Sequence, residues 1–144
     1  MNFHRKPIRF LAGVLSLLAA ASLSQVSQAT GTVSKGDLNG PWVIVLTGNT
    51  GCGISAMHVS VNLANGTGTA TSQGNSTGCG IGTSTGLPFA IETLNGNGAG
   101  TASLGCGPGC GWNFEIQVAP DRSTFSLVDV TNSLNTLTGV AIHQ

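Results

Sequence analysis

The sequence predicts an all-β protein, an antiparallel up-and-down meander of about eight strands that closes into a barrel. Apolar and polar side chains alternate in successive runs, which is typical of strands with one buried face. Short segments rich in Gly, Asn, Ser and Thr separate these runs and favour turns. Glycine makes up 22 of the 144 residues, which disfavours long helices. Because short connections join neighbouring strands, a meander is the simplest topology, and eight strands can close on themselves. A two-sheet sandwich is the alternative.

The first four expected strands cover residues 42–47, 54–65, 66–73 and 87–94. The first begins at Trp42 and is almost entirely apolar. The second alternates apolar residues with polar ones, among them His58, and the third alternates threonines with small residues. The fourth is apolar at every second residue from Leu87. Pro88 has no N–H to donate to a ladder, so it predicts a bulge or a sheet edge at that point.

The last four expected strands cover residues 99–104, 112–118, 123–130 and 137–143. The pattern is clearest from Trp112 onward, where every second residue is apolar. In the seventh run the alternation changes phase near Leu127 and Val128, which predicts a second bulge.

The first 29 residues are typical of a cleaved secretory signal peptide. Arg5, Lys6 and Arg9 precede an uncharged apolar run at 10–23, and the small-x-small sequence of residues 27–29 fits a cleavage site. The run is too short to span a membrane, and no second apolar stretch reaches spanning length, so we expect no membrane span in the mature chain. We therefore divide the chain into a signal peptide (1–29), a polar lead-in (30–38) and one domain (39–144). The expected location is periplasmic or extracellular.

The charge that remains after cleavage argues against a nucleic-acid partner. Only Lys35 and Arg122 are left as basic residues, against five acidic ones. No basic patch can form from them.

An even number of cysteines in a short exported chain predicts two disulfides. Strand parity places all four cysteines at one end of the meander, although four cysteines allow three connectivities. The sequence TGCGI occurs twice, around Cys52 and around Cys79, which indicates two equivalent loops and favours a bond between them. We pair Cys106 with Cys110 across Gly107, Pro108 and Gly109. A redox pair or a zinc site fits these spacings less well.

No constellation of residues supports catalysis, and we assign no catalytic residue, metal or cofactor. The chain lacks the G-x-S-x-G sequence of a nucleophile elbow. His58, Glu92 and Glu115 fall on the polar faces of their runs and are expected to point outward from a closed barrel. A hydrolase that uses such residues remains an alternative.

The opening Asn39-Gly40-Pro41-Trp42 resembles that of the calycin superfamily, the lipocalin and avidin-like meander barrels, and the avidin type in particular. The resemblance implies that Gly40 and Trp42 close one end of the barrel and that a cationic side chain packs over the tryptophan. Parity places Arg122 at that end, although the family usually takes this cation from or near the last strand. The aromatic residues of the avidin biotin site have no counterparts, so biotin binding is not implied.

These features predict a non-enzymatic exported barrel that binds a small ligand or a protein through its disulfide-tied end. The expected binding residues are Gly107, Pro108, Gly109 and Trp112. One alternative is a secreted protease inhibitor, because exported metalloprotease inhibitors share this barrel type and residues 30–39 have about the length of their inhibitory arm. A structural envelope or matrix component that assembles through sheet edges is another.

Overall fold

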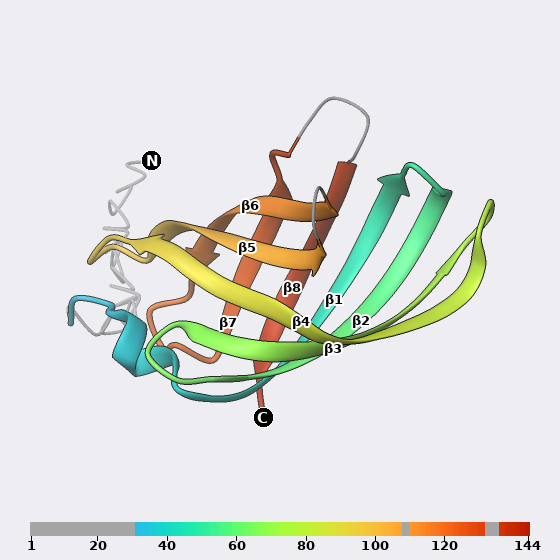
Figure 1. The fold of residues 1–144 in the computed structure, drawn as a ribbon. Coiled ribbons are helices and arrows are strands. Elements are labelled where there is room, and N and C mark those ends of the chain that lie inside the picture. The colour runs from blue at the N-terminus through green and yellow to red at the C-terminus, as the bar shows by residue number, and fades with distance from the viewer. Residues whose placement is uncertain (1–30, 108–109, 132–135) are drawn as a thin grey trace, which may run out of the picture.

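Eight antiparallel strands form a closed barrel in the computed structural model, which describes residues 31–107, 110–131 and 136–144 (Figure 1). Each strand pairs with the next, and β1 pairs with β8 to complete the closure. The predicted fold class is therefore confirmed, with the barrel in place of the sandwich. The expected signal peptide lies outside the described residues. The elements are η1 (Lys35–Leu38), β1 (Gly40–Thr50), β2 (Gly53–Leu63), β3 (Thr67–Ser76), β4 (Gly80–Leu94), β5 (Ala99–Gly107), β6 (Cys110–Val118), β7 (Thr124–Asp129) and β8 (Thr136–His143).

The β3–β4 hairpin extends further than the sequence pattern predicts. β4 begins at Gly80, seven residues before the expected start at Leu87. This early part is built of Gly, Ser, Thr and one Ile, so it has no alternating apolar face to reveal it. It is nevertheless strand because it pairs with the second half of β3.

Pro88 lies beside a bulge and at an edge, as its missing N–H predicts. The β3–β4 register shifts between Ala70 and Ser72, opposite Leu87 and Ser84. Pairing between β4 and β5 covers only the residues from Phe89 onward. Before that point, among the described residues, β4 pairs with β3 alone, and Figure 1 shows its first half curving away from β5 together with β3.

The prediction of a second bulge near Leu127 is wrong. β7 pairs with β6 and with β8 in continuous register. Leu127 is buried, and Val128 points outward with 52% of its surface exposed. The apparent change of phase arises because an outward position carries an apolar residue.

The barrel interior holds a single apolar core. Its largest members are Trp42, Phe89, Phe114 and Phe125, each at most 2% exposed. The lead-in contributes to the same core through Val33 and the fully buried Leu38. The backbone N–H of Val33 also donates to the carbonyl oxygen of Gly96 at 2.9 Å. The described part of the lead-in is therefore packed onto the barrel.

The two ends of the barrel differ. η1 lies at one end, and the β1–β2 and β3–β4 hairpins reach out at the other (Figure 1). Within the described residues, no helix has the length and apolar character needed to cross a membrane.

Candidate functional site

The end beside η1 is closed by Trp42, one of the residues expected there. Its side chain is 1% exposed, and its indole N–H donates to the carbonyl oxygen of Leu38 at 2.9 Å. Its ring centroid lies 4.9 Å from that of Phe125 and 4.8 Å from that of His143. Trp42, near the start of β1, therefore connects the lead-in with β7 and β8, the last two strands.

Gly40 makes room for the ring that covers Trp42. It has a φ of +119°, and a Cβ built on it would lie 2.7 Å from Nε2 of His143. That nitrogen lies 3.2 Å from the carbonyl oxygen of Asn39. The sequence interpretation missed His143, although its place in the last strand is where calycin-like barrels usually supply the covering cation.

Arg122, expected over Trp42, instead holds the lead-in. It lies at the same end, as parity predicts, and its Nε is 3.6 Å from a carboxylate oxygen of Asp37. Hydrogen bonds from the Ser34 side chain and backbone lower the pKa of Asp37, and the charge of Arg122 adds to this effect. In the structure, His143 makes the ring contact with Trp42, and Arg122 forms an ion pair with Asp37 of η1.

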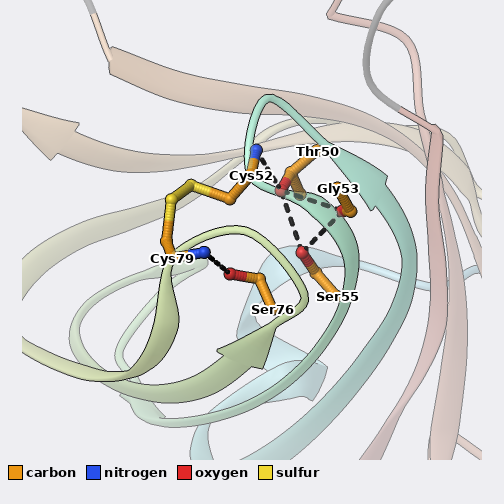
Figure 2. Close-up of a disulfide and its surroundings, with 6 residues drawn as sticks. All are labelled: Thr50, Cys52, Gly53, Ser55, Ser76 and Cys79. Carbon is orange, nitrogen blue, oxygen red and sulfur yellow. Dashed lines mark hydrogen bonds between the residues drawn. A yellow bond between two sulfur atoms is a disulfide. The ribbon is translucent and has the colours of Figure 1, made fainter.

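The opposite end is tied by the Cys52–Cys79 disulfide, which confirms the predicted pairing (Figure 2). It joins the β1–β2 turn to the β3–β4 turn, with the two Cα atoms 5.4 Å apart. A disulfide indicates an oxidising, non-cytoplasmic compartment. The side chains of Cys106 and Cys110 lie outside the described residues, so their predicted bond stays a prediction. Among the other expected binding residues, Gly107 ends β5, while residues 108 and 109 also lie outside the described part.

Hydroxyl groups organise both disulfide-bonded turns (Figure 2). The Thr50 and Ser55 hydroxyl oxygens are 2.9 Å apart, and that of Ser55 donates to the carbonyl oxygen of Gly53 at 3.0 Å. The backbone N–H of Cys52 donates to Thr50, and that of Cys79 donates to Ser76. The Thr and Ser residues of these polar segments thus satisfy the backbone where the strands end.

Beneath these turns, the mouth of the barrel holds a cavity of about 230 Å³ that is open to solvent. Its wall comes mainly from the inner faces of β2, β3 and the first half of β4, from the disulfide-bonded turns, and from one β6 side chain, and the outward residues Ala56 and Asn75 complete it. The lining residues are Thr50, Cys52, Ser55, Ala56, Met57, Ser72, Gly74, Asn75, Ser76, Cys79, Gly80, Gly82, Ser84, Leu87 and Trp112.

The cavity combines an apolar floor with hydroxyl groups, and none of its described lining residues has an ionisable side chain. Met57, Leu87 and Trp112 supply the large apolar surfaces. The hydroxyls of Ser72 and Ser84 make no hydrogen bond within the described residues, so they can bond to a guest. Trp112 was expected among the binding residues, and it lies in this wall.

Small side chains create the cavity, and the sequence interpretation missed most of them. Gly82 has no atom within 4 Å of the place where a Cβ would stand, so the space before it is open. Ser72 and Gly74 face the same space from β3. The only available signal was the run of inward small residues in the third strand. The matching residues of β4 precede the strand start that the pattern predicted.

The residues considered for catalysis do not converge. His58, Glu92 and Glu115 are exposed on the outer faces of three different strands, as expected. Glu92 accepts a hydrogen bond from the hydroxyl of Ser103 at 2.7 Å. In the described part of the chain, no group of three His, Cys, Asp or Glu residues is placed to hold a metal ion.

The comparisons with known proteins add no family assignment. No protein-family model matches the chain, and no curated protein matches it. The chain is therefore characterised by its architecture: a closed, eight-stranded antiparallel β-barrel with one plugged end and one disulfide-tied end that holds a cavity.

Proposed function

We propose that this protein is an exported, non-enzymatic binding protein of the calycin-like type. It holds a small neutral ligand in the cavity beneath the Cys52–Cys79 disulfide. The observation that carries the proposal is the lining of that cavity, whose described residues combine apolar surface with hydroxyls that have no described partner and include no charged side chain. Ligand pockets in proteins commonly combine these two features.

The lining favours a neutral ligand. A charged group in this space would lose part of its hydration and would meet no opposite charge among the described lining residues, which is costly. A neutral guest can lay its apolar part on Met57, Leu87 and Trp112. Its hydroxyl, carbonyl or amide group can then bond to Ser72 or Ser84. The ligand class that fits is a neutral molecule with an apolar body and one or two hydrogen-bonding groups.

The volume favours a small ligand. Pockets for drug-sized molecules usually measure about 300 to 1,000 Å³, and this cavity is below that range. Its walls are rigid on one side, because β2 and β3 are paired along both edges within the closed barrel. We therefore expect selection by size as well as by polarity.

Three features support the calycin-like class and export. The first strand begins with Gly40 and Trp42 at the closed end of the barrel, and the His143 ring of the last strand covers that tryptophan. The cavity lies at the other end of the same meander. The disulfide and the signal-peptide pattern both favour an oxidising destination outside the cytoplasm.

Native mass spectrometry of the protein exported by its own host tests the proposal. We expect a mass above that of the mature chain, which denaturation releases as a small neutral compound. A protein that carries no additional mass, and that gains none when incubated with small-molecule extracts of its host, would contradict the proposal.

Two matched glycine variants show whether the cavity is the site. Gly82→Leu places a side chain in the open space of the cavity, so the bound mass should disappear. Gly51→Leu adds the same side chain in the β1–β2 turn, where a Cβ also meets nothing within 4 Å, so the bound mass should remain. Equal binding by wild type and both variants would place the ligand elsewhere.

A further inference from the structure

The first half of β4 has an unpaired edge. Residues 80–84 and 87 of this strand pair with β3, and among the described residues the other side of this part of β4 has no partner strand. In Figure 1 this part of β4 extends beyond the end of β5, together with β3. A row of unpaired backbone N–H and C=O groups is a template for another strand.

The hydrogen-bond alternation identifies which groups face outward along this edge. Thr77 donates its backbone N–H to Ile54 on the β2 side, and Ser76 opposes Gly80. Alternate residues of an antiparallel strand direct their N–H and C=O groups to opposite neighbours. The even-numbered residues 80, 82 and 84 therefore bond to β3. Ile81 and Thr83 direct their backbone groups to the free side, and the regular alternation ends at the bulge that contains Thr85.

This edge lacks the devices that normally protect a free strand. Natural edges carry charged residues, proline or a bulge, or they are covered. Residues 80–85 contain no charge and no proline, and the bulge and Pro88 come only at the far end of the segment. Ile81 is 78% exposed, and Ile54 of the neighbouring hairpin is 72% exposed.

The surface around the edge is also free of charge. Residues 38–91 contain no Asp, Glu, Lys or Arg, and they include β1, β2, β3 and most of β4. Ordinary proteins have about one charged residue in four. Protein surfaces with little charge associate more readily, because the electrostatic repulsion between two copies is weak. A second copy therefore meets no electrostatic repulsion at this edge.

We propose that the unpaired edge of β4 pairs with the same edge of a second copy of this chain, which forms a twofold-symmetric dimer. Antiparallel pairing centred on Thr83 places Ile81 beside the bulge residue Thr85 of the second copy. It also sets the two Thr83 residues against each other. Pairs of β-branched residues of this kind stabilise strands. The interface is small, so the dimer is weak and depends on concentration.

Sedimentation velocity on the exported chain, with its disulfide intact, tests the proposal. Measured from about 1 µM to about 300 µM, a range suited to small interfaces, wild type should shift from monomer to dimer. Thr83→Pro removes an N–H from the free side only, so the dissociation constant of the dimer should rise at least about tenfold. Thr83→Val keeps the N–H and should dimerise like wild type. A wild-type monomer at all concentrations, or equal dimerisation by both variants, overturns the proposal.

A charge variant keeps the test decisive if the proline variant fails to fold. Thr83→Lys brings two like charges together at the twofold axis, so it should weaken the dimer, and added salt should restore part of it. Ser60→Lys places the same charge on the exposed outer face of β2, which β3 separates from the edge, and should have little effect. Equal weakening by both lysines would contradict pairing at β4.

Residue-resolved amide exchange identifies the edge directly. In dilute protein the amides of Ile81 and Thr83 should exchange rapidly, while those of Gly82 and Ser84 should be protected by β3. At high concentration the amides of Ile81 and Thr83 should become protected as well. Protection that does not change with concentration, in a sample that does dimerise, would assign the interface to another surface.

Discussion

Gly40, Trp42 and His143 fit together at the closed end because residue 40 has no side chain. The backbone there has a φ of +119°, which side-chain-bearing residues rarely adopt, and the His143 ring occupies the space where a Cβ would stand. Trp42 is then held between His143, Phe125 and the carbonyl of Leu38. A single methyl group at position 40 would therefore disturb both the backbone and the plug.

Gly40→Ala should lower the free energy of unfolding by about 1–3 kcal/mol, the usual cost of a strained backbone position. Urea unfolding followed by circular dichroism measures the change. Gly36→Ala is the matched control, because a Cβ there meets only the Ser34 hydroxyl, at an ordinary contact distance of 3.8 Å. Equal stability of the two variants would show that Gly40 is not required for the plug.

Ser34→Ala should raise the pKa of Asp37 towards its ordinary value. The Ser34 hydroxyl donates to the carboxylate at 2.8 Å, and it is the largest cause of the lowered pKa of this group. A carboxyl with a lowered pKa in the folded state contributes stability above its unfolded pKa, and this contribution is lost as the pH falls through the folded value. The stability of wild type should therefore fall more steeply below about pH 4 than that of the variant.

Titration of the Asp37 carboxyl by NMR checks this prediction directly. Ser123→Ala serves as a control, because Ser123 holds Asp121 in the same way and is not bonded to Asp37. That variant should leave the Asp37 titration unchanged. An unaltered Asp37 pKa in Ser34→Ala would contradict the role given to the hydroxyl.

At the residue scale, the sequence identifies only some of the residues that close this end of the barrel around Trp42. The Gly40-Pro41-Trp42 sequence is distinctive enough to place a tryptophan at one end. Strand parity brings Arg122 to that end correctly, but parity does not determine which side chain reaches the ring. That depends on strand register, which pairs Trp42 with His143, and on the lead-in, whose Asp37 lies close to Arg122.

Among the elements, the strands with alternating apolar residues are the ones that the sequence predicts well. β6 is found almost to its ends, because each inward position carries a large side chain. The early half of β4 is missed because its inward positions carry Gly and Ser. The same small residues that hide the strand in the sequence create the cavity in the structure. The site was therefore harder to predict than the fold.

The lead-in shows a similar limit. Its polar composition suggests a segment outside the barrel, yet Val33 and Leu38 pack into the core. Two apolar residues in a short polar segment give no periodic signal. The structure places residues 31–38 against the barrel.

Replacement of both Cys52 and Cys79 by serine should lower the free energy of unfolding by about 3.5 kcal/mol. The bond closes a loop between residues that are 27 positions apart, and its loss restores that loop entropy to the unfolded chain. Urea unfolding under non-reducing conditions measures the difference. A loss below about 1 kcal/mol would mean that strand pairing alone holds the two turns together.

The corresponding change of Cys106 and Cys110 to serine provides a comparison. If these residues form the predicted second bond, the smaller loop should give a loss of about 2 kcal/mol on the same entropy argument. The intact mass of wild type should then be about four hydrogens below that of the reduced chain, because two bonds are present. A deficit of about two hydrogens would contradict the second bond.

Across the whole molecule, one plain rule predicts the arrangement of the ends. In a meander, successive turns alternate between the two ends, so the run count alone places Cys52 near Cys79 and Arg122 near the start of β1. The structure agrees with both placements. What parity cannot supply is the difference in packing between the ends, because that depends on side-chain volume at every inward position.

This difference in packing implies that the two ends respond separately to perturbation. At the closed end, large side chains fill the interior and Trp42 is fully buried. At the other end, the first half of β4 is held by β3 and by the disulfide, and Trp112 lies beside the cavity. Local opening of a folded protein begins where few apolar contacts hold a segment. Loss of the disulfide should therefore loosen the cavity end and leave the plug intact.

The two tryptophans report on these ends independently, because each gives one indole N–H signal by NMR. In the Cys52→Ser/Cys79→Ser variant, the Trp112 signal should shift and exchange faster with solvent. The Trp42 signal should keep its position and its slow exchange, since its bond to Leu38 lies at the plugged end. Trp112→Phe assigns the signals by removing one of them. If both indoles changed together, the barrel would open as a single unit, and the disulfide would stabilise the plug as much as the cavity.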